Sequence, residues 1–504
     1  MVGTIPPGDY RDLEQGHLEQ GHRSRGTHAD EGVHGSPPVR GLPASRPGHW
    51  LGWLAAVLVA LIAGPPAPAQ QKTGPGVPAE ESLTWRGITL YGVVDIGIQY
   101  DTHSAPFTPY RPAASGNIVR QNSYQSVTGL TPSNMGQSRV GLQGSEPLAG
   151  DWAAVFQVET FFNPQSGQIA DSLKSLAVNN GKPLTAQSVG VDGSSAGQAF
   201  QTAFAGVQSA RFGALTFGRQ VALVSEGMIT YDPNYLATAF GLLGASNTYA
   251  GAGSSEDNRL DSTVKYLLSL GGLLHIGGLY KLNGSNGSGG TGVQADVGSS
   301  FAGAAVDAYY SRMKSSITAS SLSVAQAAAL PPEYSLANSL AATVSDNTAY
   351  ALMGSYKLAS LKLFGGYEYI KYENPDTPLS AGFGDIGGYV LAFVNDTAYK
   401  EAKIVQVYWS GVRYALIPQL ELTAAYYGVH QSAYGAGSEA GCSTNAHSTC
   451  SGSLAAFSFD ADYRFNVHFD VYLGAMYSGV HDGMAVGYIH TTNINPTLGV
   501  RYKF

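Results

Sequence analysis

From Gly87 onward the chain alternates apolar and polar residues with a period of two. In the segment 88–100, aliphatic residues occupy five of the even positions, whereas Asp95 and Gln99 fall on the opposite face. Helical spacing would scatter these apolar residues around an axis, so the pattern predicts a strand with one apolar face.

Similar segments recur to the end of the chain, and together they predict sixteen strands. The segments span about 88–100, 137–144, 152–162, 199–208, 214–220, 259–269, 273–282, 291–299, 304–313, 347–358, 361–373, 402–415, 420–431, 454–463, 467–480 and 496–504.

The connections between these segments alternate in length. Short ones lie at 146–150, 210–213, 270–272, 300–303, 358–360, 416–419 and 464–466, and long polar ones include 101–136, 163–198, 221–258, 314–346, 374–401 and 432–453. Short turns on one side and long loops on the other are typical of an antiparallel meander across an outer membrane.

A sheet in lipid must close on itself, because every backbone N–H and C=O needs an internal partner there. We therefore predict an all-β fold, a sixteen-stranded antiparallel transmembrane β-barrel with short periplasmic turns and long extracellular loops. A soluble β-sandwich or propeller is the alternative. The chain shows no repeat of the length of a propeller blade, and in a sandwich long loops would not fall at every second connection.

Composition supports the same class. Of 504 residues only 13% are charged, against roughly 25% in an ordinary soluble domain, and 64 are Gly and 30 are Tyr. So many aromatics exclude a disordered chain. A formal charge of −8 without a Lys/Arg cluster argues against nucleic-acid binding.

The N-terminus carries the features of an export signal. An apolar run of about 15 residues, 50–64, follows Arg40 and Arg46 and precedes Ala67-Pro68-Ala69, and it is short of the roughly 20 residues that a membrane-spanning helix needs. We predict a polar extension at 1–49, a signal-peptide region at 50–69 cleaved after Ala69, and the barrel at 70–504. A membrane anchor is the alternative reading of the apolar run.

Two cysteines, Cys442 and Cys450, lie in one short Gly/Ser/Thr-rich segment. In an exported protein such a pair favours a disulfide. His447 between them leaves a metal site open, although zinc normally requires four protein ligands, or three and a water.

Five segments resemble the general porins of Gram-negative bacteria, in the order in which that family has them. They are Thr89–Asp95, Ser138–Leu148, Phe212–Gln220, Asp257–Tyr266 and the terminal Leu498–Phe504. The resemblance implies a homotrimer and a third extracellular loop, 221–258, folded into the lumen. It also implies that the aromatic end, Phe504 with Tyr502 on the same face, is read by the barrel-assembly machinery.

The same resemblance implies a charged constriction. Its acidic side would come from the loop, with Glu226, Asp232, Glu256 and Asp257, and its basic side from wall residues that match by motif, Arg139, Arg219 and Arg259.

Residue parity gives independent support for part of this set. Arg139 shares a face with Gln143, and Arg259 shares one with Asp261 and Lys265. Asp95, Gln157 and Glu159 also point inward by parity. Arg219 shares parity with Leu215 and Phe217, so its inward placement needs a break in the alternation near Gly218.

These expectations describe a porin in the outer membrane of a Gram-negative bacterium. It would pass small hydrophilic solutes and ions by passive diffusion, contact outer-membrane lipid and lipopolysaccharide, and need no cofactor or metal. A substrate-specific channel is the alternative within the barrel class, and an outer-membrane adhesin or enzyme is the alternative outside it. Gly193-Ser194-Ser195-Ala196-Gly197 matches a hydrolase pattern, but the strand-turn-helix context of that motif is missing.

Overall fold

The computed structural model describes residues 83–104, 125–169, 174–183, 186, 199–245, 259–271, 273–282, 290–386, 388–436, 441–442, 448–485 and 489–504. The chain divides into Met1–Ala79 and Glu80–Phe504, and the description below concerns the second unit. The predicted extension and signal-peptide region lie outside the described residues, as do Glu256 and Asp257 of the predicted inward loop.

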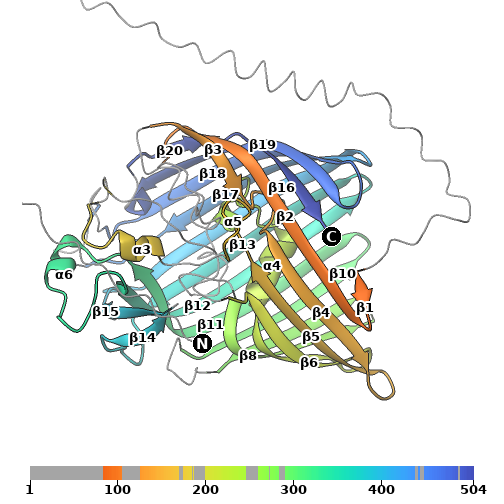
Figure 1. The fold of residues 1–504 in the computed structure, drawn as a ribbon, viewed down its shortest axis with the longest axis horizontal. Helices are drawn as coiled ribbons and strands as arrows, with labels where there is room; N and C mark the ends of the chain where they lie inside the picture. Colours follow the sequence, from red (N-terminus) through yellow and green to blue (C-terminus); the bar gives the residue numbers. More distant parts are fainter. Residues whose placement is uncertain are drawn as a thin grey trace, which may run out of the picture. The chain divides into compact units, whose positions relative to one another are not determined.

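Sixteen antiparallel strands form the wall of a closed barrel (Figure 1). They are β2 (Ile88–Asp101), β4 (Arg139–Pro147), β5 (Trp152–Phe161), β6 (Thr202–Ser209), β7 (Gly213–Val221), β8 (Arg259–Leu270), β9 (Leu274–Lys281), β10 (Gly292–Phe301), β11 (Ala304–Ser320), β12 (Ser339–Leu358), β13 (Leu361–Glu373), β16 (Lys403–Ile417), β17 (Leu420–Gln431), β18 (Gly452–Arg464), β19 (Phe469–Asp482) and β21 (Thr497–Lys503).

The barrel closes where β21 pairs with both β19 and β2. At this seam Val93 is opposite Lys503 and Gln99 is opposite Thr497. Pairing the first wall strand with the last satisfies the edge groups that an open sheet would expose to lipid. The sixteen predicted strands are thus confirmed.

Strand lengths differ most from the prediction on one side of the wall. β11 has 17 residues and β12 has 20, because both continue beyond the predicted 304–313 and 347–358. Five shorter strands were also missed, namely β1 (Thr84–Trp85), β3 (Val127–Pro132), β14 (Phe383–Ile386), β15 (Tyr389–Asn395) and β20 (Thr492–Ile494). They are too short or too irregular for an alternating pattern to show.

The extended strands carry a small additional cluster at the long-loop end. β15 pairs in parallel with the start of β12 and antiparallel with β14. Leu340, Val344 and Leu391 form its buried centre. Short helices accompany these long loops, namely α3 (Lys174–Val178), α6 (Val324–Ala328) and the 3₁₀ turn η5 (Gly483–Ala485).

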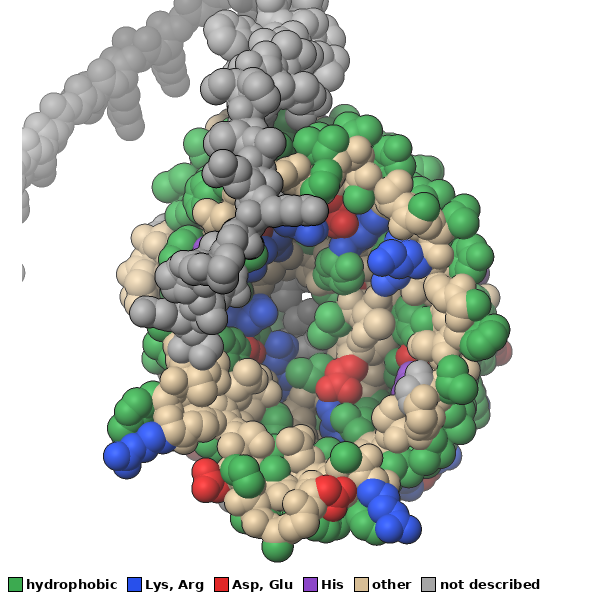
Figure 2. All heavy atoms as spheres, turned by 90° about the vertical axis from the view of Figure 1, so that its right-hand side faces the viewer, with side chains coloured by type: hydrophobic (Ala, Val, Ile, Leu, Met, Phe, Trp, Pro, Cys, Tyr) green, Lys and Arg blue, Asp and Glu red, His purple; other side chains and the backbone are tan. Residues whose placement is uncertain are grey.

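The alternation of the sequence becomes a division between two faces of the wall. On β10, Val293 and Val297 are exposed on the outside, whereas Gln294 and Asp296 are buried on the inside. Figure 2 views the end at which the short turns lie. It shows hydrophobic side chains around the outside and charged side chains around a central hollow.

Candidate functional site

The connection from β7 to β8 enters the barrel rather than projecting from it. Its first part forms α4 (Leu223–Tyr231), which contacts β9 to β13, and a short helix α5 (Leu242–Ala245) follows. The residue before α4 is Ala222, which has no side chain that could cap the helix. Gln294 on the wall supplies the missing acceptor, because its Oε1 accepts from the backbone N–H of Leu223 at 2.7 Å. We call residues 222–245 the inner loop.

Apolar contacts hold α4 against the wall. Leu223 and Met228 are buried in a cluster that also contains Met353, Ile370 and Trp409. The indole Nε1 of Trp409 donates to the backbone oxygen at the end of α4 at 2.9 Å. Each fully buried side chain of this size contributes roughly 1.5–3 kcal/mol, so the helix is fixed in place.

Asp232 is an anchor of the inner loop, and this corrects its expected role as a lumen charge. Its carboxylate is fully buried, where it accepts from Tyr427 at 2.6 Å and from the N–H of Leu236 at 2.7 Å. Burial raises the pKa of Asp232, and the hydrogen bond from Tyr427 opposes that rise. A side chain without access to water cannot contact a passing ion directly.

Asp95 also points inward and is also fully buried. It accepts from the hydroxyl of Tyr472 at 2.5 Å and from the N–H groups of Met135 and Gly136 at 2.8 and 2.9 Å. These bonds hold the stretch between β3 and β4 against the wall. The inward direction of Asp95 was predicted correctly, but its place in a constriction is corrected to a structural one.

Glu226 on α4 and Lys265 on β8 form an ion pair inside the barrel. Lys265 is buried, and its ammonium also donates to the backbone oxygen of Val221 at 3.1 Å. The side chain of Glu226 remains 41% exposed and lines two neighbouring cavities, of about 890 and about 510 Å³. The inner loop therefore presents one accessible acid to the lumen.

A second ion pair lies on the wall, and its acid, Glu159, lines the smaller cavity. The Arg139 guanidinium is 3.2 Å from Glu159, which also accepts from the hydroxyl of Tyr91 at 3.1 Å. Tyr91 in turn accepts from Gln157 at 2.6 Å. Arg139 is the accessible member, with 36% of its side chain exposed against 9% for Glu159.

Arg219 does not join this group. Thr216, Gln220 and Val221 on the same strand line the smaller cavity, whereas Arg219 does not. Its guanidinium binds Asp261 at 2.6 Å. Gly218 has a φ of 135° and the register with β8 shifts beside it, which is the break in alternation that an inward Arg219 needs. The place of Arg219 in a constriction stays a prediction.

The alternation also breaks in β8, between Arg259 and Lys265. Ser262 has a φ of 55°, as expected for a bulge residue. Leu260 is consequently buried in the cluster that packs on α4, so simple alternation no longer relates Arg259 to Lys265. The guanidinium of Arg259 stacks over Phe161, 4.6 Å from the ring centroid.

A family model described as "Gram-negative porin" matches residues 55–483. The chain belongs to the Gram-negative porin family. An outer membrane porin protein of Bordetella pertussis is 30% identical over 180 residues, which are 36% of this chain and 38% of that protein. The match thus spans well under half of that relative.

Two solved structures share the fold of this porin. The anion-selective porin from Comamonas acidovorans is 16% identical, with a TM-score of 0.54, over 83% of this chain and 99% of the other. A loop L8 deletion mutant of OmpT from Vibrio cholerae is 15% identical, with a TM-score of 0.51, over the same shares. No helix among the described residues is long and apolar enough to cross a membrane.

Arg413 is a wall residue of this porin that the sequence analysis missed. It is buried on β16, donates to the backbone oxygen of Pro233 and stacks on Tyr235, with its guanidinium carbon 3.2 Å from the ring centroid. Glu421 lies 3.4 Å away. Arg413 therefore holds the inner loop and does not face the lumen freely. The alternation of β16 could have indicated that Arg413 points inward. Arg413 lies outside the five segments that resemble the porin family, so the resemblance did not include it.

A row of ion pairs continues from Arg413 toward the seam of this porin. Arg464 binds Glu421 at 3.3 Å, and Arg501 binds Asp462 at 3.1 Å and Asp470 at 2.9 Å. Acids and bases alternate along the row, so most of its charge is compensated locally.

The two remaining pairs of candidate residues lie at opposite ends of the porin. Cys442 and Cys450 form a disulfide in the long-loop region. Phe504 pairs with Gly92 through backbone bonds of 2.9 and 3.1 Å, and the exposed ring of Tyr502 lies 6.3 Å from the Phe504 ring. The role of this aromatic end as an assembly signal stays a prediction.

Proposed function

We propose that this chain forms a water-filled channel across the outer membrane, through which small hydrophilic solutes and ions diffuse down their gradients. The observation that carries the proposal is a closed wall of sixteen strands that encloses charged cavities of about 890 and 510 Å³. A barrel of this size is too wide for side chains to fill, so an aqueous passage remains.

Selection in this channel would take place between the inner loop and the wall. Glu226 is the accessible acid on the loop and lines the smaller cavity. Arg139 is the accessible base on the wall, paired with Glu159, which lines the same cavity. Opposite charges facing each other across a narrow passage create a transverse field, and charged groups at a constriction decide which ions pass. Lys265 and Glu159 would tune this field as the buried partners of the two groups.

The proposal extends to assembly and surroundings. OmpT of Vibrio cholerae, which has a TM-score of 0.50 and 15% identity to this chain, has been solved in a trimer form. By analogy, we propose that this chain forms a homotrimer. The exposed apolar band would contact lipid and lipopolysaccharide, and the aromatic C-terminus would bind the barrel-assembly machinery. The proposed activity is passive and involves no catalysis.

Single-channel recording in a planar lipid bilayer tests this function. A general porin trimer gives large ohmic steps in three equal levels. A substrate-specific channel gives small steps that its substrate blocks. An adhesin or enzyme on the same scaffold gives almost no conductance, and that result would overturn the proposal.

A further inference from the structure

Two rows of residues cross β9, β10 and β11 on the inner face of the wall. In the first row His275 is opposite Gly298, which is opposite Asp307. In the second row Gly277 is opposite Asp296, which is opposite Tyr309. The two carboxylates therefore lie diagonally across adjacent strands, each beside a glycine.

The glycines are what allow these side chains to meet. A Cβ at Gly298 would lie 1.9 Å from Oδ1 of Asp307 and 2.3 Å from Cε1 of His275. A Cβ at Gly277 would lie 1.9 Å from Oδ1 of Asp296. Because neither glycine has a Cβ, His275 reaches across the intervening strand, and its Nε2 is 3.3 Å from Asp307 and 3.6 Å from Asp296.

In this arrangement the imidazole of His275 lies within ion-pair distance of both carboxylates. The side chains of Asp296 and Asp307 are only 5% and 6% exposed. Tyr309 donates to Oδ2 of Asp307 at 3.1 Å, but Oδ1 of each aspartate is buried without a hydrogen-bond partner. Nearly buried carboxylates that lack full compensation are costly, so the cluster gains from an added cation.

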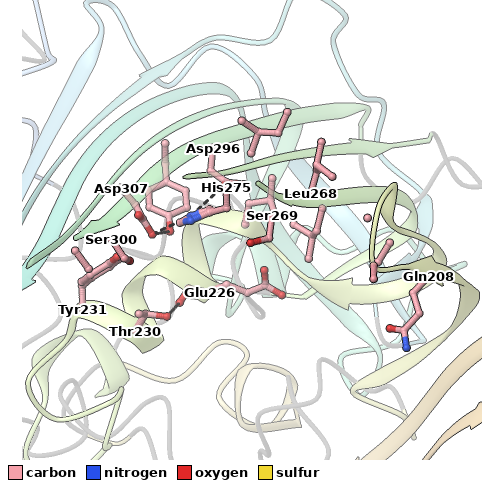
Figure 3. Close-up of a pocket in the computed structure, with 18 of the residues that line it drawn as sticks. Gln208, Glu226, Thr230, Tyr231, Leu268, Ser269, His275, Asp296, Ser300 and Asp307 are labelled. Carbon is pink, nitrogen blue, oxygen red and sulfur yellow. Dashed lines mark hydrogen bonds and ion pairs between the residues drawn. The ribbon is translucent and has the colours of Figure 1, made fainter. Parts of the chain in front are cut away.

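The cluster opens on the larger cavity, beneath α4. Figure 3 shows Asp296, His275 and Asp307 on the wall facing Glu226 and Tyr231 on the helix, with the cavity between them. The acidic residues that line this cavity are Asp151, Glu226, Asp296 and Asp307, and the lysine that lines it is Lys362. The lining thus carries an excess of negative charge.

We propose that His275, Asp296 and Asp307 form a binding station for the ammonium or guanidinium head group of a small organic cation in transit. The N–H donors of such a group would reach the carboxylates on the cavity side, and Tyr309 and Tyr231 would bound its apolar part. The station rests on the proposed channel function, because the cation enters through the lumen. It would retain cations in the part of the passage beneath the inner loop.

The test uses the full-length protein in a planar bilayer with KCl, and ethylguanidinium as the probe on the short-turn side. We expect transient interruptions of the wild-type current that saturate with probe concentration. Asp296→Asn and Asp307→Asn should each weaken binding by at least about tenfold, as expected for the loss of one member of a buried charge cluster. Asp151→Asn is the matched control, because it removes one acid from the same cavity outside the cluster, and it should change binding by less than about twofold.

The outcomes separate the station from the channel. Equal loss in Asp151→Asn and Asp296→Asn would mean nonspecific attraction by the cavity and would overturn the station. A conducting wild type without interruptions would also overturn it while leaving the channel intact, and absence of KCl conductance would overturn both. If the asparagine variants do not fold, His275→Lys is the deciding variant. Its amine would occupy the cluster and should abolish the current interruptions caused by the probe. Interruptions at the wild-type frequency in His275→Lys would contradict the proposal.

Discussion

The hydroxyl of Tyr427 donates a 2.6 Å hydrogen bond to Asp232, although 195 residues separate the two in sequence. The same hydroxyl accepts from Nδ2 of Asn234 at 2.9 Å, and that amide also donates to Ser458 on β18 at 3.0 Å. These contacts join the inner loop to β17 and β18 immediately after the end of α4.

Removing this hydroxyl should destabilise the porin. Tyr427→Phe leaves a buried carboxyl with one acceptor unsatisfied, which costs about 1–3 kcal/mol. Urea or guanidinium unfolding in detergent micelles measures the change. The matched control is Tyr367→Phe, because the Tyr367 hydroxyl bonds Gln406 at 2.9 Å on an exposed surface. Equal losses in the two variants would contradict the anchoring role of Tyr427.

Asp232 should also give the folded porin a pH dependence. Its pKa is raised by burial, so between the unfolded value of about 4 and the folded value the native state binds more protons than the unfolded state. The free energy of unfolding from this group is therefore greatest at low pH and falls as pH rises through the folded pKa. Asp232→Asn should lack this decrease in the free energy of unfolding with pH. The measurement is the free energy of unfolding of both proteins from pH 4 to pH 9. The same pH dependence in both proteins would show that Asp232 has no such role.

The accessible arginine should influence ion selectivity. Arg139→Gln removes a charge from the lumen, and at about 5 Å in water one charge changes the energy of an ion by roughly 0.8 kcal/mol. We expect the ratio of cation to anion permeability to rise about two- to fourfold, measured as a reversal potential in a KCl gradient. Arg219→Gln should leave the ratio near the wild-type value, because the Arg219 side chain is only 11% exposed and its charge is paired with Asp261. A larger shift in Arg219→Gln than in Arg139→Gln would reverse this assignment.

Deleting Phe504 should impair assembly. The deletion removes two backbone hydrogen bonds to Gly92 at the barrel seam as well as the terminal aromatic ring. We expect misassembled protein in the periplasm and loss of the heat-modifiable band on gels. Phe301→Ala, which removes an exposed ring at the turn between β10 and β11, is the comparison. Normal trimer yield after the deletion would disprove the prediction.

Most of the barrel could be predicted because its physics is local. One side of each strand faces lipid and the other faces the lumen, so a period of two marks wall strands such as 361–373 and 420–431, which agree with β13 and β17 to the residue. The same rule failed in β8, since the bulge at Ser262 reverses parity and nothing in the alternation of the sequence announces it.

The site was harder to predict from the sequence, because the alternation indicates that a side chain points inward but not how far it is exposed to water. Asp95 and Asp232 point inward as Glu226 does, yet loop segments cover both of them completely. The meeting of His275 with Asp307 depends on Gly298 in the strand between them. That relationship requires the register of three strands, which only the folded sheet provides.

The far end of the inner loop has a consequence for biogenesis. Ala239 donates to the backbone oxygen of Asn134 at 3.0 Å and accepts from the side chain of Asn495 at 2.8 Å. These two asparagines come from opposite ends of the barrel sequence and meet only after the first and last wall strands have joined. The contacts that fix this end of the inner loop thus require both ends of the barrel sequence, so they are complete only in a molecule whose seam is closed.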